Sequence, residues 1–221
     1  MRSLAPKLAR FGGPLAVILL SLLFYWKLAF TDQYVWFDHP DMVNLELPRL
    51  QYQAWQVQHR HFPLWDPNIW CGQPLIGQTQ PGPLSPLNLL FLFLPMQDGY
   101  LRTTCLNGYY VFLHLLAALG AYALARELRL GKTASALAAC LFSFSGFLGT
   151  VPWLDVMNGG ITTPLVALFF LRALRRRPWT NAALAGLFLG FAWLSGHHEL
   201  PLLVSLTALV AWAVAGWRDR R

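Results

Sequence analysis

The sequence predicts an all-α integral membrane protein with about six transmembrane helices and a long extracytoplasmic first loop. Of its 221 residues, 56% are hydrophobic and 12% are charged, a balance outside that of ordinary soluble domains. Apolar segments close to the length of a bilayer span recur along the chain. In a single membrane domain, the predicted spans are 11–30, 105–125, 133–151, 156–171, 179–196 and 200–217, and residues 31–104 form the loop.

These spans sort the charges by side. The face that carries both termini holds 13 of the 17 basic residues: Arg2, Lys7, Arg10, Arg126, Arg129, Lys132, Arg172, Arg175, Arg176, Arg177, Arg218, Arg220 and Arg221. By the positive-inside rule this face is cytoplasmic, so we expect a multi-pass inner-membrane protein with both termini in the cytoplasm. These basic clusters account for the net charge of +7, and we expect them to contact the anionic headgroups of the bilayer. Nucleic-acid binding is therefore not expected. Most acids fall outside, which predicts a site in the outer half of the membrane.

The elements follow in chain order. The first apolar run is long, contains Lys27 and lacks a cleavage site, so it is predicted as an uncleaved span. Apolar residues at helical spacing, with Pro48 in the first turn, predict an amphipathic helix over 47–60 in the outer interface. Dense Pro and Gly predict a folded-back loop after it. Residues 83–95 are apolar but too short to span, which predicts a re-entrant or interfacial hairpin.

Three acids are candidates for chemistry. Asp38 and Asp41 follow the first span, where a carboxylate can act as a general base or hold a hard cation. They could equally be solvated loop acids. Asp155 lies in the short outer turn between the third and fourth spans, so it emerges on the same face, although a lone acid there is ordinarily a turn residue.

The segment between the last two spans contains His197, His198 and Glu199. Two imidazoles and a carboxylate could bind zinc, but adjacent histidines point in different directions and no H-x-x-x-H spacing is present. Hydrogen bonding to a phosphate or a sugar hydroxyl is favoured over a metal site, and plain interfacial polarity is the alternative. Cys71 and Cys105 both fall outside, where a disulfide could form, but free thiols are the favoured prediction.

Few basic residues and several tryptophans lie on the outer side. Arg49, Arg60 and Arg102 are candidates for binding a lipid phosphate, because a guanidinium fork suits phosphate geometry. The alternative for each is a headgroup contact without catalytic meaning. Trp65 and Trp70 could stack on a sugar ring or a prenyl chain, although an aromatic belt at the interface also explains them.

This layout resembles that of GT-C glycosyltransferases, and more closely that of YfhO-like bacterial membrane proteins. The resemblance covers about residues 31–200 and is carried by motifs of the first loop and of the last outer turn. These motifs are Phe62-Pro63-Leu64-Trp65-Asp66-Pro67, Gly72-Gln73-Pro74-Leu75, Gln80, Ser85-Pro86-Leu87 with a short apolar run ending in Pro95, and Ser195-Gly196-His197-His198-Glu199.

The resemblance implies inverting transfer of a sugar from a polyprenyl-phosphate donor to an extracytoplasmic acceptor. Asp38 matches the first-loop acid and would be the base, with Asp41 as the fallback. Asp155 matches the second-loop acid, which in some members helps to hold a divalent cation, Mg²⁺ or Mn²⁺, near the leaving phosphate. Family members usually continue beyond six spans, so we expect the N-terminal portion of a larger core, completed by further chain or a partner subunit.

Two other classes stay open. A transporter or lipid-handling protein would also show outer acids and a re-entrant hairpin, but it would more often place acids inside the spans. A non-catalytic membrane scaffold would make Asp38, Asp155 and the histidine pair dispensable. Within the second span, His114 is either an interhelical donor or a residue that lines a cavity.

Overall fold

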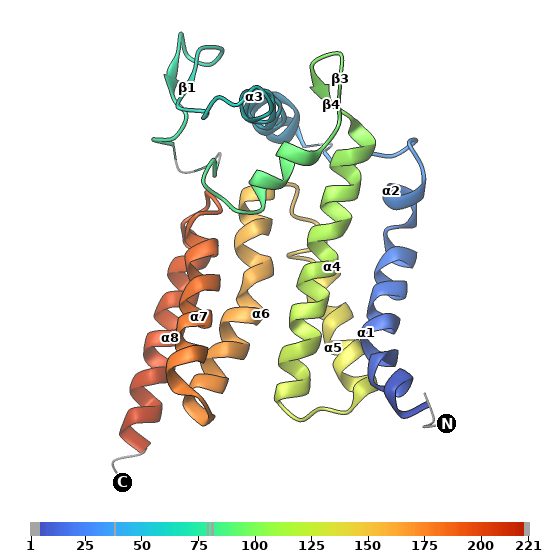
Figure 1. The fold of residues 1–221 in the computed structure, drawn as a ribbon, viewed down its shortest axis with the longest axis vertical. Helices are drawn as coiled ribbons and strands as arrows, with labels where there is room; N and C mark the ends of the chain where they lie inside the picture. Colours follow the sequence, from blue (N-terminus) through green and yellow to red (C-terminus); the bar gives the residue numbers. More distant parts are fainter. Residues whose placement is uncertain (1–4, 38, 79, 81, 219–221) are drawn as a thin grey trace.

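The computed structural model describes residues 5–37, 39–78, 80 and 82–218, and it is mostly helical. The helices are α1 (Ala5–Phe24), α2 (Trp26–Phe30), α3 (Leu47–Gln58), α4 (Thr103–Glu127), α5 (Lys132–Ser143), α6 (Leu154–Arg175), α7 (Pro178–Trp193) and α8 (Glu199–Arg218). Figure 1 shows α1 and α4 to α8 running side by side, with both chain ends at one end of the bundle. At the opposite end, α3 and the loops around it form a cap.

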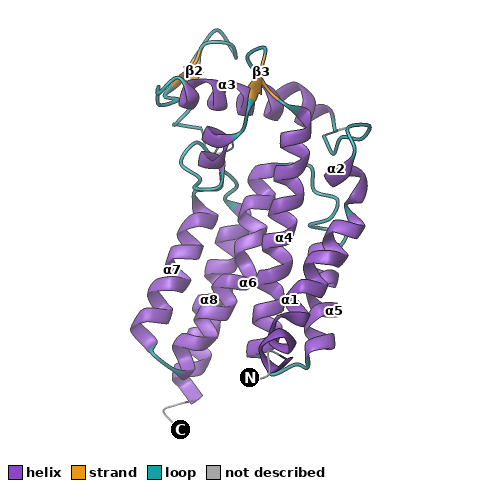
Figure 2. Cartoon of the chain, turned by 45° about the vertical axis from the view of Figure 1, so that its right-hand side comes forward, coloured by secondary structure: helices purple, strands orange, loops and turns teal. Residues whose placement is uncertain are grey.

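The cap holds the short elements of the described chain. A π-helical turn, η1 (Met42–Glu46), runs directly into α3. Two antiparallel hairpins pair β1 (Trp65–Asp66) with β2 (Gln73–Pro74) and β3 (Met96–Gln97) with β4 (Tyr100–Leu101), and η2 (Asn88–Phe93) is a 3-10 helix. Gln51 of α3 exchanges two hydrogen bonds with the backbone of Leu101, so α3 is tied to the second hairpin (Figure 2).

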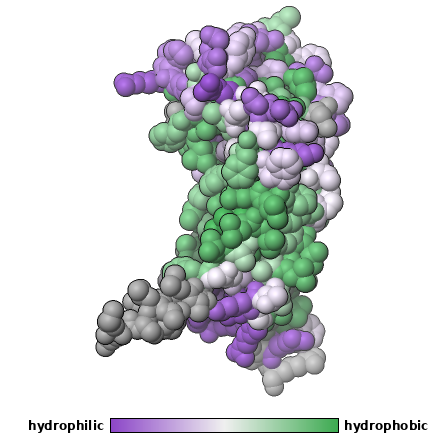
Figure 3. All heavy atoms as spheres, turned by 90° about the vertical axis from the view of Figure 1, so that its right-hand side faces the viewer, coloured by the Kyte–Doolittle hydropathy of each residue, from purple (hydrophilic) through white to green (hydrophobic). Residues whose placement is uncertain are grey.

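Three helices in the described part of the chain are long and apolar enough to cross a membrane, namely α4, α6 and α8. Residues Phe11–Phe24 of α1 form a shorter apolar run. Figure 3 shows a hydrophobic belt between polar regions at the two ends of the molecule. These features indicate a membrane protein, and the predicted spans 105–125, 156–171 and 200–217 lie within the three helices.

The bundle has two groups of helices joined at its centre. Helices α1, α4 and α5 pack together, as do α6, α7 and α8, and α4 packs against α6. At Gly120 of α4, an added Cβ would lie 3.4 Å from side-chain atoms of Pro164 and Leu165 on α6. Small residues of this kind let two helix backbones approach closely in a membrane.

Two helix boundaries differ from the ends of the predicted spans. Within the predicted span 133–151 the helix ends at Ser143, where Ser143 Oγ donates to the carbonyl oxygen of His114, 2.9 Å away, on α4. Residues 145–150 then form turns, and the ring nitrogens of His114 lie 3.0 Å from the carbonyl oxygens of Tyr110 and Leu148, which holds these turns to α4. Helix α6 begins at Leu154, so Asp155 lies inside a helix and not in an exposed turn.

The other local predictions have different outcomes. The helix predicted over 47–60 is present, although it ends at Gln58, and its placement in the outer interface stays a prediction. The first span is divided at Tyr25, between α1 and α2. Residues 83–95 form turns and η2, and the re-entrant placement stays a prediction. The cysteines at 71 and 105 are free thiols, as favoured from the sequence.

Candidate functional site

The buried face of α3 combines apolar residues with polar ones. Glu46, Arg49 and Gln53 follow one another at a helical spacing of three and four residues, so they share a face, and all three are buried. Arg49 Nη1 donates to Glu46 Oε1 over 3.3 Å. An ion pair removed from water needs further polar partners to offset its desolvation, so the surroundings of this pair define the site.

Asp155, in the first turn of α6, supplies a second buried carboxylate. It is 6% exposed, and its Oδ1 accepts a hydrogen bond of 2.8 Å from the backbone N–H of Val156. Its charge interacts with Arg49 and with His197, which lies in the turn between α7 and α8. Glu46, Arg49 and Asp155 are buried and His197 is half-buried, and we call these four residues the buried ionic cluster because the charge of Asp155 interacts with the other three. They come from three segments that are far apart in the sequence.

Glu46 is the group in this cluster best suited to exchange a proton. Burial and then the negative charge of Asp155 raise the pKa of the Glu46 carboxyl, the positive charge of Arg49 lowers it, and the net result is a pKa of about 7. A carboxyl group that titrates near neutral pH can act as a general acid or base under physiological conditions.

A second set of polar contacts lies one turn further along α6. Asn158 Nδ2 donates to Asn88 Oδ1 over 3.0 Å, and Asn88 Nδ2 donates to the carbonyl oxygen of Gly82 over 2.9 Å. Gly82 has a φ of 51°, and a Cβ added there would lie 2.3 Å from the carbonyl oxygen of Ser195. This close approach shows that the 82–88 loop lies against the turn between α7 and α8, and only glycine suits the position.

Four buried polar atoms around the start of α6 have no hydrogen-bond partner among the described residues. They are Arg49 Nε, Ser85 Oγ, Asn158 Oδ1 and His197 Nδ1. Leaving such an atom unpaired costs about 1–3 kcal/mol, so each of them is suited to a hydrogen bond with ordered water or a polar ligand group. The donors and acceptors come from α3, the 82–88 loop, α6 and the turn before α8.

The predicted acids and histidines differ in where they lie. Asp38 lies outside the described residues. Asp41 is exposed, with one carboxylate oxygen 3.8 Å from His39 Nδ1, and its charge reaches Glu46. His198 and Glu199 are both exposed, and His198 faces a small hollow beside the 76–84 loop. Of the predicted phosphate- or sugar-binding residues, the structure therefore brings only Arg49 and His197 to Asp155.

The other predicted outer residues lie at the surface of the cap. Arg60 is exposed, and Arg102 is exposed with its Nε donating to Gln97 Oε1 over 3.1 Å. Trp70 is 84% exposed, and Trp65 packs against the backbone at Gly72. These four residues do not contribute to the buried ionic cluster.

The cap also carries a cleft of about 560 Å³ on the side of α3 toward the hairpins. Its lining combines three aromatic side chains with two acids: Tyr52, Trp55, Tyr100, Asp66 and Asp98. The Tyr52 hydroxyl donates to the carbonyl oxygen of Trp65 over 2.8 Å, which fixes one wall. Trp55 is among the residues that line this cleft, and the predicted Trp65 and Trp70 are not.

A divalent cation needs several oxygen or nitrogen ligands at one point. The described residues contain no group of three or more His, Cys, Asp and Glu side chains that could hold a metal ion. These residues alone therefore do not form the Mg²⁺ or Mn²⁺ site that the resemblance implies at Asp155, and a role for Asp38 in such a site stays a prediction.

Sequence reasoning missed Glu46, Asn88 and Asn158 as site residues. A signal existed for two of them. Glu46 lies three residues before Arg49, and Asn158 lies three residues after Asp155, so each polar pair occupies one helix face. Asn88 carries no comparable signal, because its role depends on where the 82–88 loop folds back.

Comparison with known proteins does not place the chain in a family. No family model, no curated protein and no solved structure matches it. The geometry of the buried ionic cluster is therefore the main basis for a functional proposal.

Proposed function

We propose that this chain is the membrane-embedded part of a glycosyltransferase that transfers a sugar from a polyprenyl-phosphate donor to an acceptor outside the inner membrane. The observation that carries the proposal is the buried ionic cluster, where a carboxyl group with a pKa of about 7 lies with Arg49 and Asp155 under the cap. The resemblance to GT-C enzymes supplies the class of donor.

The proposed reaction is a displacement at the anomeric carbon. A carboxylate accepts the proton of the acceptor hydroxyl, whose oxygen bonds to the sugar as the bond from the sugar to the lipid phosphate breaks. The phosphate leaves with the bonding electrons, and a guanidinium such as Arg49 stabilises the added negative charge. Asp38 is the base implied by the resemblance, and Glu46 and Asp155 are the buried carboxyl groups that the geometry favours.

The proposal includes a topology. Helices α1 and α4 to α8 would all cross the membrane, with both termini in the cytoplasm and the cap outside. Helix α5 has 12 residues, or about 18 Å of helix, which is shorter than a hydrocarbon core of about 30 Å. The turns from 144 to 151 would therefore complete its crossing while packed within the bundle.

The cleft beside α3 lies on the helix face opposite Glu46 and Arg49, so it is suited to a part of the acceptor away from the reacting hydroxyl. Its aromatic side chains can stack on a sugar ring, and its carboxylates can accept hydrogen bonds from sugar hydroxyl groups. In this proposal, the exposed apolar face of α8 meets lipid, further chain or a partner subunit. Leu202, Leu206, Leu209 and Trp212 lie on that face.

Transfer can be measured in membranes that contain the protein, with a radiolabelled polyprenyl-phosphate sugar and separation of the glycosylated product. We expect Glu46→Gln and Asp155→Asn each to lower the rate at least a hundredfold, within the range for loss of a general acid or base. Glu199→Gln is the matched control and should retain the rate, because Glu199 is exposed. Full transfer by both cluster variants, with unchanged thermal unfolding, would overturn the proposal.

One observation favours a lipid-handling or transport protein as the alternative. Asp155 is buried within α6, a candidate span, and an ionisable residue there often marks a substrate or proton path. Reconstituted vesicles distinguish the two functions. Movement of a labelled lipid between leaflets without sugar transfer would support the alternative.

A further inference from the structure

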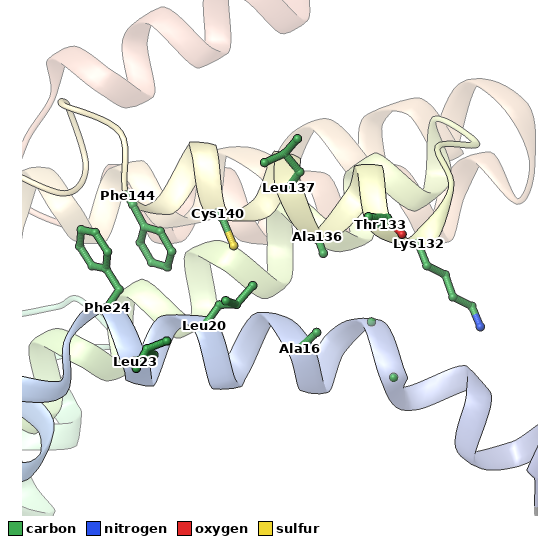
Figure 4. Close-up of a pocket in the computed structure, with 12 residues that line it drawn as sticks. Ala16, Leu20, Leu23, Phe24, Lys132, Thr133, Ala136, Leu137, Cys140 and Phe144 are labelled. Atoms are coloured by element: carbon green, nitrogen blue, oxygen red, sulfur yellow. The ribbon is translucent and has the colours of Figure 1, made fainter.

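A long apolar groove runs between α1 and α5, away from the buried ionic cluster. Its volume is about 750 Å³, and its lining is almost wholly apolar (Figure 4). Gly12 and Ala16 of α1 lie across from Ala136 of α5, so small residues leave the space that larger side chains would fill. A Cβ added at Gly12 would meet no atom within 4 Å, which shows that the groove is open there.

The two ends of the groove differ. At one end, the rings of Phe24 and Phe144 stack with centroids 4.3 Å apart and an angle of 4° between their planes. At the other end lie Lys132 and Thr133, with the Lys132 ammonium directed away from the apolar part (Figure 4). The groove therefore joins an aromatic end to a cationic end.

The cationic end lies where positive charge accumulates. Arg126 and Arg129 lie near Lys132, at the end of α4 and in the turn that leads to α5, and both are exposed. Glu127 is the acid of this segment, and its carboxylate is occupied by Arg172 at 2.7 Å and Arg176 at 2.8 Å. A negatively charged group at the mouth of the groove would therefore meet net positive charge.

We propose that this groove binds one acyl chain of an anionic phospholipid, with the lipid phosphate at Lys132. Charge favours an anionic headgroup at this end. Length agrees as well, because the 12 residues of α5 extend about 18 Å, close to the single leaflet that makes up half of a hydrocarbon core of about 30 Å. The chain would lie against Ala136 and Leu20 and end near Phe24 and Phe144.

Lipid retention tests the proposal without any transfer reaction. The purified protein in detergent is incubated with phosphatidylglycerol or phosphatidylcholine of identical acyl chains, and bound lipid is counted by native mass spectrometry. We expect the wild type to retain phosphatidylglycerol preferentially. Lys132→Gln should reduce that preference about fivefold, since one basic residue near a lipid surface contributes about 1 kcal/mol. Lys27→Gln, outside the groove, is the charge control and should keep the preference.

A second variant tests the apolar part. Gly12→Leu places a side chain in the groove, and the open space at this position allows it to fold. We expect it to lower retention of phosphatidylglycerol about tenfold, while Gly216→Leu on α8, also open around its Cβ, should not. Equal retention of the two lipids by the wild type, or unchanged retention by Gly12→Leu, would overturn the proposal. Displacement of phosphatidylglycerol by a polyprenyl phosphate would also overturn it and assign the groove to that lipid.

Discussion

Helices α6 and α8 are alike in length, hydropathy and end charges but differ in how deeply they are buried. Helix α6 has 22 residues and a mean hydropathy of 1.5 over its most apolar window, and α8 has 20 residues and a value of 1.9. Each has an acid in its first turn, Asp155 or Glu199, and arginine in its last turn. Yet 67% of the window of α6 is buried and only 6% of that of α8.

The difference in burial between α6 and α8 follows from their small and polar residues and not from their mean hydropathy. The first turns of α6 contain Asn158, Gly159 and Gly160, and the glycines lie against Ser195 and Leu148. Such residues let a backbone approach its neighbours and bond across helices, so they mark a helix at the centre of a bundle. Helix α8 instead exposes leucine and tryptophan to its surroundings. Mean hydropathy identifies a candidate span, and small residues indicate whether that span lies at the centre of the bundle or at its edge.

The largest expected effect on stability concerns the positive charge of Arg49, which stabilises the buried carboxylate of Asp155 in α6. Arg49→Met leaves Asp155 and Glu46 buried without their guanidinium. We expect the free energy of unfolding to fall by about 3 kcal/mol, the low end for a broken buried ion pair, because Glu46 can take up a proton. Chemical unfolding in detergent measures it. Arg60→Met, at an exposed site, should stay within about 0.5 kcal/mol. A change below about 1 kcal/mol for Arg49→Met would show that charge does not hold Asp155.

The next effect uses pH to distinguish Glu46, whose carboxyl interacts with Asp155 at the start of α6, from the exposed acid of α8. Because the pKa of Glu46 is raised to about 7 in the folded protein, the fold prefers the protonated form, and stability is lost as the pH rises through about 7. Glu46→Gln should remove this loss and be more stable than the wild type at pH 8, by on the order of 2 kcal/mol, but not at pH 4. Glu199→Gln, which makes the same change at the exposed start of α8, is the matched control. Parallel profiles for Glu46→Gln and the wild type would contradict this assignment.

A smaller effect tests the packing of the two helices directly. A Cβ added at Gly160 of α6 would lie 2.9 Å from Leu148, whereas one at Gly216 of α8 would meet nothing within 4 Å. Gly160→Val should therefore destabilise the protein by about 1–3 kcal/mol through overpacking. Gly216→Val has the same change of residue type and should differ from the wild type by about 0.5 kcal/mol or less. Equal losses at the two positions would mean that α6 is no more enclosed than α8.

Much of the helical architecture follows from the sequence, because apolar runs and the spacing of residues 47–57 are local signals. The C-terminal end of α5 does not follow from the sequence. Residues 144–151 are as apolar as a span requires, and the helix ends at Ser143 because of contacts with His114 on another helix. Contacts between distant segments decide such boundaries, and periodicity carries no information about them.

The site was predictable in part for the same reason. Arg49, Asp155 and His197 stand out in the sequence as polar residues near the outer ends of apolar segments. Their meeting with Glu46 depends on α3 folding back over the start of α6, which no local pattern specifies. The sequence also suggested that a transporter would place acids inside spans. The inclusion of Asp155 in α6 weakens that argument against a transporter.

The last comparison measures how fast a single cysteine in the first turn of each helix reacts with a thiol reagent. Val156 is 7% exposed and Glu199 is exposed. With the three native cysteines replaced, an impermeant maleimide added to intact cells should label Glu199→Cys and react far more slowly with Val156→Cys, because a buried thiol is shielded from the reagent. Restoring Cys71 alone, which is exposed, gives the positive control. In the proposed topology Arg176→Cys is cytoplasmic and stays unlabelled until the membrane is opened. Equal labelling of Val156→Cys and Glu199→Cys would place the start of α6 at the surface, and the first turns of the two helices would then be equally exposed.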